Sequence, residues 1–370
     1  MDMYKNRLNH LREFLRDKGL DGVVISKLEN LHYFSGFTGD DSMLVIGMNS
    51  AQLITDFRYI EQAEKEAPDF QIRKQEKGLL RRVGELINEE GLQKVGFEGS
   101  NLCFDWHGKI AQLLHDADFT TSVSLDSLRQ IKSAEELACI RKAMAIGDEA
   151  FNYILTYIRP GISENDVAAA LENVMRAKGS QCPSFTTIVA SGKRGSLPHG
   201  TATEKLINLG EFVTMDYGAV YRGYHSDMTR TICVGSPDEK QRKIYNLVLQ
   251  GQKLGVSLVK PGASGKSVDA AVRQLFRAAG YDKYFGHGLG HSVGLEIHEE
   301  PRLSPASTCE ALEENMLVTV EPGIYIPDWG GVRIEDTVAV TPDGCEILTH
   351  SNKELIELCI CLLYTSPSPR

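Results

Sequence analysis

Two aspartates, Asp216 and Asp227, stand in apolar stretches typical of strands, on either side of a predicted turn at 221–223. They lie symmetrically about the centre of this turn, so we expect them to be cross-strand neighbours with Cβ atoms about 4.5–5.5 Å apart. Like charges at that distance are destabilising, and Asp is a poor strand residue. A bound metal ion is the simplest compensating charge for such a pair.

A second acidic pair follows in the last third of the sequence. Glu321 and Glu335 are equidistant from Asp328, which we place in a loop between two more apolar strands. Any one of these acids alone is more simply explained as a solvated residue on a strand face. Two hairpins that each present two facing acids favour a metal site instead.

A glycine-rich segment between the two predicted hairpins carries His287, His291 and His298. The first two are four residues apart, as on a zinc-binding helix, but the glycines around them disfavour a helix. A glycine-rich loop allows the backbone to approach a ligand closely. A single histidine is usually structural, whereas three in this short segment favour a functional site. His199, in a loop before the first hairpin, is weak evidence alone.

An internal repeat precedes each hairpin. Residues 159–179 and 260–280 align without a gap at an offset of 101, and nine of the 21 pairs are identical. Two unrelated helices that both begin after Pro-Gly and Ser would look similar. The number of identities favours a duplicated αβ unit.

The first third of the sequence alternates helical patterns with short apolar runs, which predicts an α/β domain with a mixed sheet. We place this domain at 1–126 and a second domain at 133–358, separated by a short polar stretch. Residues 359–370 show no periodic pattern, and we expect a non-native or disordered tail there. Strands are expected at 22–25, 43–46, 52–54 and 95–98, and helices near the N-terminus and at 57–67, 78–90 and 104–115.

The composition is typical of a globular protein, with 42% hydrophobic and 24% charged residues. The formal net charge is −10, which argues against a general binder of nucleic acids or anionic membranes. No apolar stretch is long enough to span a bilayer, and the charged N-terminus lacks the apolar core of a signal peptide. The eight cysteines are scattered, which suits reduced thiols. We therefore expect a cytoplasmic protein.

These motifs together resemble the pita-bread metallopeptidases, and specifically their Xaa-Pro aminopeptidase and Xaa-Pro dipeptidase (prolidase) branch. The resemblance covers residues 1–358, and its motifs are specific in this order and spacing. It implies an α/β (α+β) fold with an N-terminal creatinase/prolidase-like domain before a pseudo-twofold pita-bread metallopeptidase domain. The motifs are Leu197-Pro-His-Gly, Asp216-Tyr-Gly, Ser226-Asp-Met-Thr-Arg, Gly286-His-Gly-Leu-Gly-His, His298-Glu-Glu-Pro, Thr319-Val-Glu-Pro-Gly-Ile-Tyr and Gly331-Val-Arg-Ile-Glu-Asp, with 33–39 and 55–59 in the N-terminal domain.

The resemblance also implies two divalent metal ions. Their oxygen-rich ligand set suits Mn²⁺, with Co²⁺ or Zn²⁺ as alternatives. By similarity Asp227 and Glu335 bridge the ions, Arg333 orients a carboxylate, and Glu321 also moves a proton. The implied metal ligands are Asp216, Asp227, His291, Glu321 and Glu335, and the implied substrate-contacting histidines are His199, His287 and His298.

The function implied is that of an aminopeptidase that hydrolyses the Xaa–Pro bond at the N-terminus of peptides, with a metal-bridging hydroxide as nucleophile. The expected partners are peptides with proline second and another copy of the chain in a homodimer, and neither nucleic acid nor membrane. An Xaa-Pro dipeptidase remains an alternative that no motif excludes. A creatinase-like C–N hydrolase without metals and a non-catalytic pita-bread binding protein are disfavoured, because all five ligand positions are intact.

Overall fold

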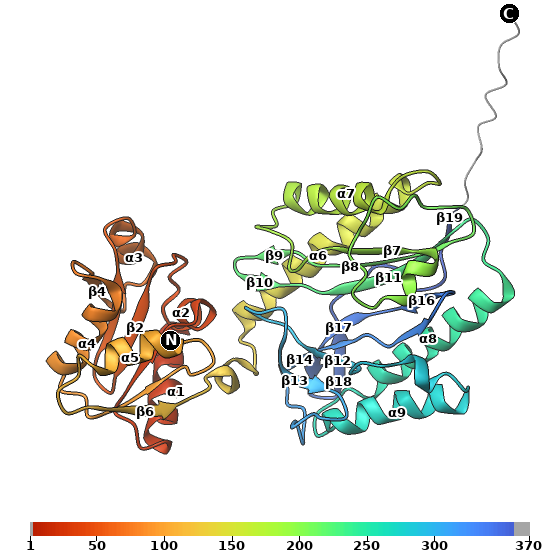
Figure 1. The fold of residues 1–370 in the computed structure, drawn as a ribbon. Coiled ribbons are helices and arrows are strands. Elements are labelled where there is room, and N and C mark those ends of the chain that lie inside the picture. The colour runs from red at the N-terminus through yellow and green to blue at the C-terminus, as the bar shows by residue number, and fades with distance from the viewer. Residues whose placement is uncertain (1–2, 359–370) are drawn as a thin grey trace, which may run out of the picture. The chain divides into compact units, whose positions relative to one another are not determined.

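The computed structural model describes residues 3–358, so the tail expected at 359–370 lies outside the described residues. The chain forms two compact units, and the boundary between them falls between Arg129 and Gln130 (Figure 1). No helix formed by the described residues is long and apolar enough to cross a membrane.

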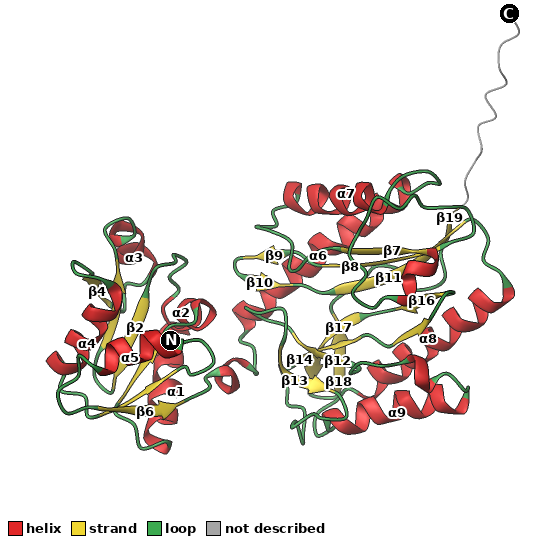
Figure 2. Ribbon diagram, viewed as in Figure 1, coloured by secondary structure: helices red, strands yellow, loops and turns green. Residues whose placement is uncertain are grey.

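The first unit contains a six-stranded sheet in the order β4-β3-β2-β1-β5-β6. Figure 2 shows strands of this unit with its helices around them. Strand β1 pairs antiparallel with β2 and parallel with β5, which confirms the predicted mixed sheet. Every residue of β1, β2 and β3 is buried, as in sheets covered on both faces. Its elements are α1 (Met3–Asp17), β1 (Gly22–Ile25), α2 (Leu28–Ser35), β2 (Met43–Gly47), β3 (Ala51–Thr55), α3 (Ile60–Glu66), β4 (Gln71–Lys74), α4 (Leu79–Glu89), β5 (Lys94–Phe97), α5 (Phe104–Ala111), β6 (Asp118–Ser122) and a 3₁₀ turn (Asp126–Arg129).

Helix α2 and strands β4 and β6 are absent from the sequence-based prediction. The residue before α2, Lys27, does not cap the helix with its side chain. Instead the buried carboxylate of Glu98, about 70 residues later, accepts hydrogen bonds from the amides of Ser26 and Lys27, both at 2.7 Å. The helix therefore begins directly after two amides that a residue distant in sequence satisfies, and no local capping motif predicts it.

The second unit contains the predicted repeat. Helices α7 (Glu164–Ala177) and α9 (Gly265–Ala278) have 14 residues each and begin 101 residues apart. The preceding helices, α6 (Ala134–Tyr157) and α8 (Glu239–Leu258), also end 101 residues apart. The duplicated αβ unit is thus confirmed. The strands are β7 (Ile188–Ser191), β8 (Phe212–Tyr217), β9 (Val220–Tyr221), β10 (Tyr224–His225), β11 (Met228–Val234), β12 (Gly290–Ser292), β13 (Glu299–Leu303), β14 (Leu317–Val320), β15 (Gly323–Ile326), β16 (Gly330–Arg333), β17 (Asp336–Thr341), β18 (Gly344–Ile347) and β19 (Glu357–Leu358), and two 3₁₀ turns span Gly192–Ser196 and Asp282–Tyr284.

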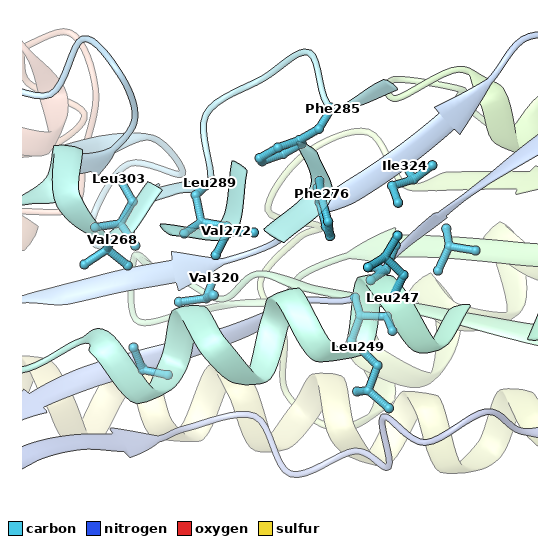
Figure 3. Packing of buried hydrophobic residues seen from close by; sticks show 14 of the residues in the cluster. Leu247, Leu249, Val268, Val272, Phe276, Phe285, Leu289, Leu303, Val320 and Ile324 are labelled. Atoms are coloured by element: carbon cyan, nitrogen blue, oxygen red, sulfur yellow. The ribbon is translucent and has the colours of Figure 1, made fainter. Parts of the chain in front are cut away.

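Each repeat supplies one layer of helices over the strands. Helices α6 and α7 lie on one side of the strands, and α8 and α9 lie on the other (Figure 1). One core packs α6 and α7 against β7, β8 and β11, and a second packs α8 and α9 against the strands after them. Val268, Val272 and Phe276 of α9 contribute to this second core with Leu289 and Val320 (Figure 3). The strands that carry the acids are thus held between the two helix layers.

The register of the first hairpin differs from the prediction. Asp216 pairs with Thr229, not with Asp227. The turn is centred between Arg222 and Gly223, because both adopt positive φ, 50° and 82°, as a two-residue hairpin turn requires. Since this shift moves the partner by two residues, both aspartates stay on the same face as diagonal neighbours.

The second hairpin has the predicted register. Strand β14 pairs with β17, and β15 pairs with β16. In both ladders the paired residues are equidistant from Asp328, as predicted. Glu321 and Glu335 fall at facing positions in the gap between these two ladders. Neither residue is inside a strand, so each acid interrupts an otherwise apolar strand run.

The two repeat helices begin with unequal caps. Ser163 accepts from the amide of Asp166, whose carboxylate accepts from the Ser163 amide in return, whereas Ser264 accepts only from the Ser267 amide. We expect Ser163→Ala to cost about 1 kcal/mol of unfolding free energy and Ser264→Ala about half of that.

Urea unfolding midpoints measure this difference. Ser257→Ala, at an exposed position near the end of α8, is the matched control and should change the free energy by less than about 0.5 kcal/mol. Equal losses for the two cap variants would show that the second hydrogen bond of the Ser163 hydroxyl, which it donates to the Asp166 carboxylate at 2.8 Å, adds nothing.

Candidate metal centre

Three carboxylates, in or directly before three strands, meet below the surface of the second unit. Asp216 lies in β8, Asp227 directly precedes β11, and Glu335 directly precedes β17. One oxygen of each lies within 4.8 Å of the others, and Asp227 and Glu335 are buried. The two hairpins therefore bring the predicted acids together from positions up to 119 residues apart.

His291 and Glu321 complete the set of five. The Nε2 atom of His291, in β12, is 3.3 Å from Glu321 Oε1 and 3.5 Å from Asp227 Oδ2. Its Nδ1 atom is 3.0 Å from the carbonyl oxygen of Ser292. A carbonyl only accepts, so Nδ1 carries the proton in the neutral ring, and the Nε2 lone pair faces the acids, as in metal-binding histidines.

Burial and mutual repulsion dominate the electrostatics of these acids. Burial, together with the charges of Glu335 and Asp216, raises the pKa of Asp227 well above its usual range. Burial and the charges of Glu321 and Asp216 likewise raise the pKa of Glu335. Burial alone would also raise the pKa of Glu321, but the hydrogen bond and charge of the protonated His291 ring outweigh burial and lower that pKa to about 2.

Arg333 holds several groups of the site in place. Its Nη2 donates to Asp216 Oδ2 at 2.6 Å, its Nη1 to the Tyr325 hydroxyl at 2.9 Å, and its Nε to Thr229 Oγ1 at 3.0 Å. The Thr229 hydroxyl in turn donates to Glu335 Oε2 at 2.8 Å. The predicted orienting role of Arg333 therefore extends, through Thr229, to a second acid.

Tyr325 and Thr229 are site residues that the sequence analysis did not identify. Tyr325 closes the motif at 319–325, and Thr229 is the ladder partner of Asp216. The correct register of the first hairpin would have pointed to Thr229. Burial raises the pKa of Tyr325 to about 12, so its hydroxyl keeps its proton.

The acids fit divalent cations. Asp216 Oδ1 and Glu335 Oε1 are buried and have no hydrogen-bond partner among residues 3–358. An unsatisfied buried oxygen costs about 1–3 kcal/mol, and more when it is charged. Carboxylate oxygens with one imidazole are ligands that Mn²⁺ and related ions accept. These residues are therefore suited to hold positive ions between their oxygens.

A cavity of about 570 Å³ opens directly beside the acids. His287 lines it, with Nδ1 at 2.7 Å from the Gly288 carbonyl and Nε2 at 2.9 Å from the Tyr325 hydroxyl. Its Nδ1 therefore donates and its Nε2 accepts, and burial lowers the pKa of this histidine. His287 is thus a neutral ring whose orientation is fixed through Tyr325 by Arg333.

His298 and His199 line the same cavity. The ring centroid of His298 is 4.4 Å from that of His291, and burial lowers the pKa of His298, as does the charge of His291. His199 lies in the loop after β7 with Pro198 and Thr201, which also line the cavity. The cavity therefore brings together all three histidines expected to contact substrate.

One glycine of the glycine-rich segment is required for packing. A Cβ on Gly290 would lie 1.9 Å from the carbonyl oxygen of Thr319, so β12 can approach β14 only with glycine at this position. This contact brings His291 next to Glu321. The predicted close approach of this loop to a ligand stays a prediction, and Gly288 and Gly290 line the cavity beside the acids.

Comparisons with known proteins agree with both units. Residues 138–342 match Metallopeptidase family M24, and residues 7–131 match the Creatinase/Prolidase N-terminal domain. The solved Xaa-Pro dipeptidase from Bacillus anthracis is 44% identical with a TM-score of 0.93, over 96% of this chain and 99% of that one. The two-part fold expected from the resemblance is therefore confirmed.

Two further relatives carry related names. The solved X-Pro aminopeptidase from Thermotoga maritima is 35% identical with a TM-score of 0.86, over 92% of this chain and 98% of that one. The Xaa-Pro dipeptidase of Pyrococcus horikoshii is 39% identical over 363 residues, which cover 96% of this chain and all of that protein. Relatives with both activities in their names thus cover nearly the whole chain.

The raised pKa of Asp227 predicts how Asp227→Asn behaves without metal. In the wild type, the stability linked to a raised pKa is present below the ordinary pKa of Asp and is lost as pH rises through the folded-state pKa. The metal-free Asn variant, which lacks this charge, should melt above the metal-free wild type at pH 8, by about 2–4 °C per kcal/mol relieved. The difference should shrink towards pH 4.

The same variant should lose bound metal and nearly all activity, because a ligand charge is gone. Melting curves between pH 4 and 8 and metal analysis of the purified protein measure both effects. Asp343→Asn, at an exposed position of the same unit, is the control. An Asn variant that retains wild-type metal content would show that Asp227 is not a ligand.

Proposed function

The chain belongs to metallopeptidase family M24, and we propose that it hydrolyses the Xaa–Pro bond at the free amino end of short peptides. One observation carries this proposal: the acids Asp216, Asp227 and Glu335 meet beside a cavity that His199, His287 and His298 line. Names of relatives such as the Xaa-Pro dipeptidase from Bacillus anthracis support the proline specificity.

We assign the five ligand positions as the sequence motifs suggest. Asp216, Asp227, His291, Glu321 and Glu335 would hold two divalent ions, with Asp227 and Glu335 between them. Bound there, such ions lower the pKa of water and so supply a nucleophile near neutral pH. We propose Mn²⁺ as the ion, because four of the five ligands are carboxylates. The homodimer and the cytoplasmic location remain predictions.

The remaining groups act on the substrate. Glu321 is ionised and can carry a proton on a carboxylate oxygen to the leaving proline nitrogen. His298 is neutral and still has one N–H with which to donate to the scissile carbonyl oxygen, where negative charge develops. His287 contacts the substrate with a ring that the Tyr325 hydroxyl holds in place, and His199 contacts the substrate at its proline side.

Arg302 favours dipeptides as the preferred substrates within this class. Its side chain is half-exposed, lines the cavity with Ser304, and lies 3.3 Å from Glu300. The free carboxylate of an Xaa-Pro dipeptide is a stronger partner for a guanidinium than the neutral carbonyl at the same place in a longer peptide. A dipeptidase is therefore the candidate that this arginine supports over the aminopeptidase expected from the sequence.

Arg302→Gln separates the two activities. If dipeptides are preferred, the variant should raise KM for Ala-Pro by about tenfold and change KM for Ala-Pro-Ala much less, because only the first loses a charged contact. Rates with metal-loaded protein measure this, and Arg277→Gln, on the exposed face of α9, is the control. A wild type that cleaves the tripeptide faster, with no effect of Arg302→Gln, would indicate an aminopeptidase.

His298→Ala and His199→Ala separate transition-state stabilisation from substrate binding. Loss of an oxyanion donor should lower kcat by about 10²–10³ with metal content unchanged. Loss of a contact that is equal in the ground and transition states should raise KM instead, which we expect for His199→Ala. If both histidines only pack loops, both variants should lose stability while the folded fraction keeps wild-type kinetics.

A further inference from the structure

One buried carboxylate organises the loop that carries His199. Glu164, the first residue of α7, has an exposed fraction of 0%. Its Oε1 accepts from the amide and the hydroxyl of Ser191, both at 2.8 Å. Its Oε2 accepts from the amide and the hydroxyl of Thr203, at 3.2 and 2.8 Å, and from Arg194 Nη1. One side chain thus satisfies five donors from a single loop.

These donors lie at both ends of the segment 191–203, whose middle carries Pro198 and His199. Arg194 extends the arrangement, because its Nη2 donates to the carbonyl of Thr201 at 2.8 Å. The ring of His199, in contrast, takes part in no hydrogen bond or ion pair with the described residues. Its position therefore depends on the path of the loop backbone, and Glu164 fixes both ends of that path.

The second repeat shows that the helix itself does not need this acid. The residue equivalent to Glu164 at the offset of 101 is Gly265, and α9 has the same length as α7 and also begins after a serine. At the same offset the segment 191–203 corresponds to 292–304, and there the start of α9 packs directly on the backbone: a Cβ on Gly265 would lie 2.2 Å from the carbonyl oxygen of Arg302. The carboxylate at the first position of α7 is therefore not required to start the helix, and its hydrogen bonds go to the segment 191–203.

We propose that Glu164 is a positioning residue for substrate binding, which acts by holding the loop 191–203 so that His199 reaches the proline side of the substrate. This inference rests on the proposed function, since it assigns the loop to substrate contact. None of the five hydrogen bonds that Glu164 accepts comes from a proposed metal ligand, so its loss should leave metal binding intact. The effect should appear in KM rather than in kcat.

Glu164→Gln tests this role with little change in shape. The amide nitrogen of Gln cannot accept, so the donors at one end of the loop lose their partner. With an Xaa-Pro dipeptide, KM should rise about tenfold, and kcat should change less than about threefold. Metal content should equal that of the wild type. Glu172→Gln, in the same helix but outside this cluster, should leave all three quantities unchanged.

The decisive comparison uses the background His199→Ala. If Glu164 acts through His199, Glu164→Gln should have little further effect on KM there, because the two changes remove the same contact. Full additivity would overturn the proposal, as would a folded Glu164→Gln protein with wild-type KM. If Glu164→Gln does not fold, Thr203→Val replaces it; a KM unchanged in that variant would overturn the proposal.

Amide hydrogen exchange separates this proposal from the proposed function. The amide whose acceptor is lost, that of Ser191 or that of Thr203, should exchange faster in Glu164→Gln than in Glu172→Gln, whatever the substrate. A wild type without Xaa-Pro activity would refute the proposed function while this measurement still tests the loop. Unchanged exchange at both amides would refute the role of Glu164 even in an active enzyme.

Discussion

Four carboxylates buried around one point repel each other and cannot all remain ionised without cations among them. Burial makes this constraint severe, because the charges cannot be screened by water. Arg333 provides one fixed positive charge against Asp216, and His291 provides another against Glu321 while it is protonated. Asp227 shares the same His291 at 3.5 Å, and among the described residues Glu335 forms no ion pair. The pKa values of Asp227 and Glu335 are both raised well above the usual range of a carboxyl group.

The fold meets this constraint by distributing the acids over two hairpins held between two helix layers. Each repeat contributes one hairpin, and no single hairpin brings more than two acids together. Hydrogen bonds to uncharged side chains connect the titratable groups of the site. Thr229 joins Arg333 to Glu335, and Tyr325 joins Arg333 to His287. Thr229 is a residue of the first half that holds two groups of the second, whereas the contacts of Tyr325 stay within the second half.

The sequence predicts those parts of the fold and site that follow from short-range patterns. The repeat, the mixed sheet and the second hairpin can be found because apolar runs, caps and symmetry about a loop are local. Helix α2 and the roles of Tyr325 and Glu164 cannot be found in this way, since each depends on a partner distant in sequence. The register of the first hairpin was missed by two residues because the turn centre, at Arg222 and Gly223, was placed one residue too early.

The division of the ligands between the two repeats has a consequence for how the molecule comes apart. Asp216 and Asp227 belong to the first repeat, while His291, Glu321 and Glu335 belong to the second, so separating the halves breaks the site in two. Ions held by both halves would act as a noncovalent cross-link that closes a loop of about 100 residues, and such closures gain with loop length. Removing the ions would therefore speed the opening of the two halves before either half unfolds.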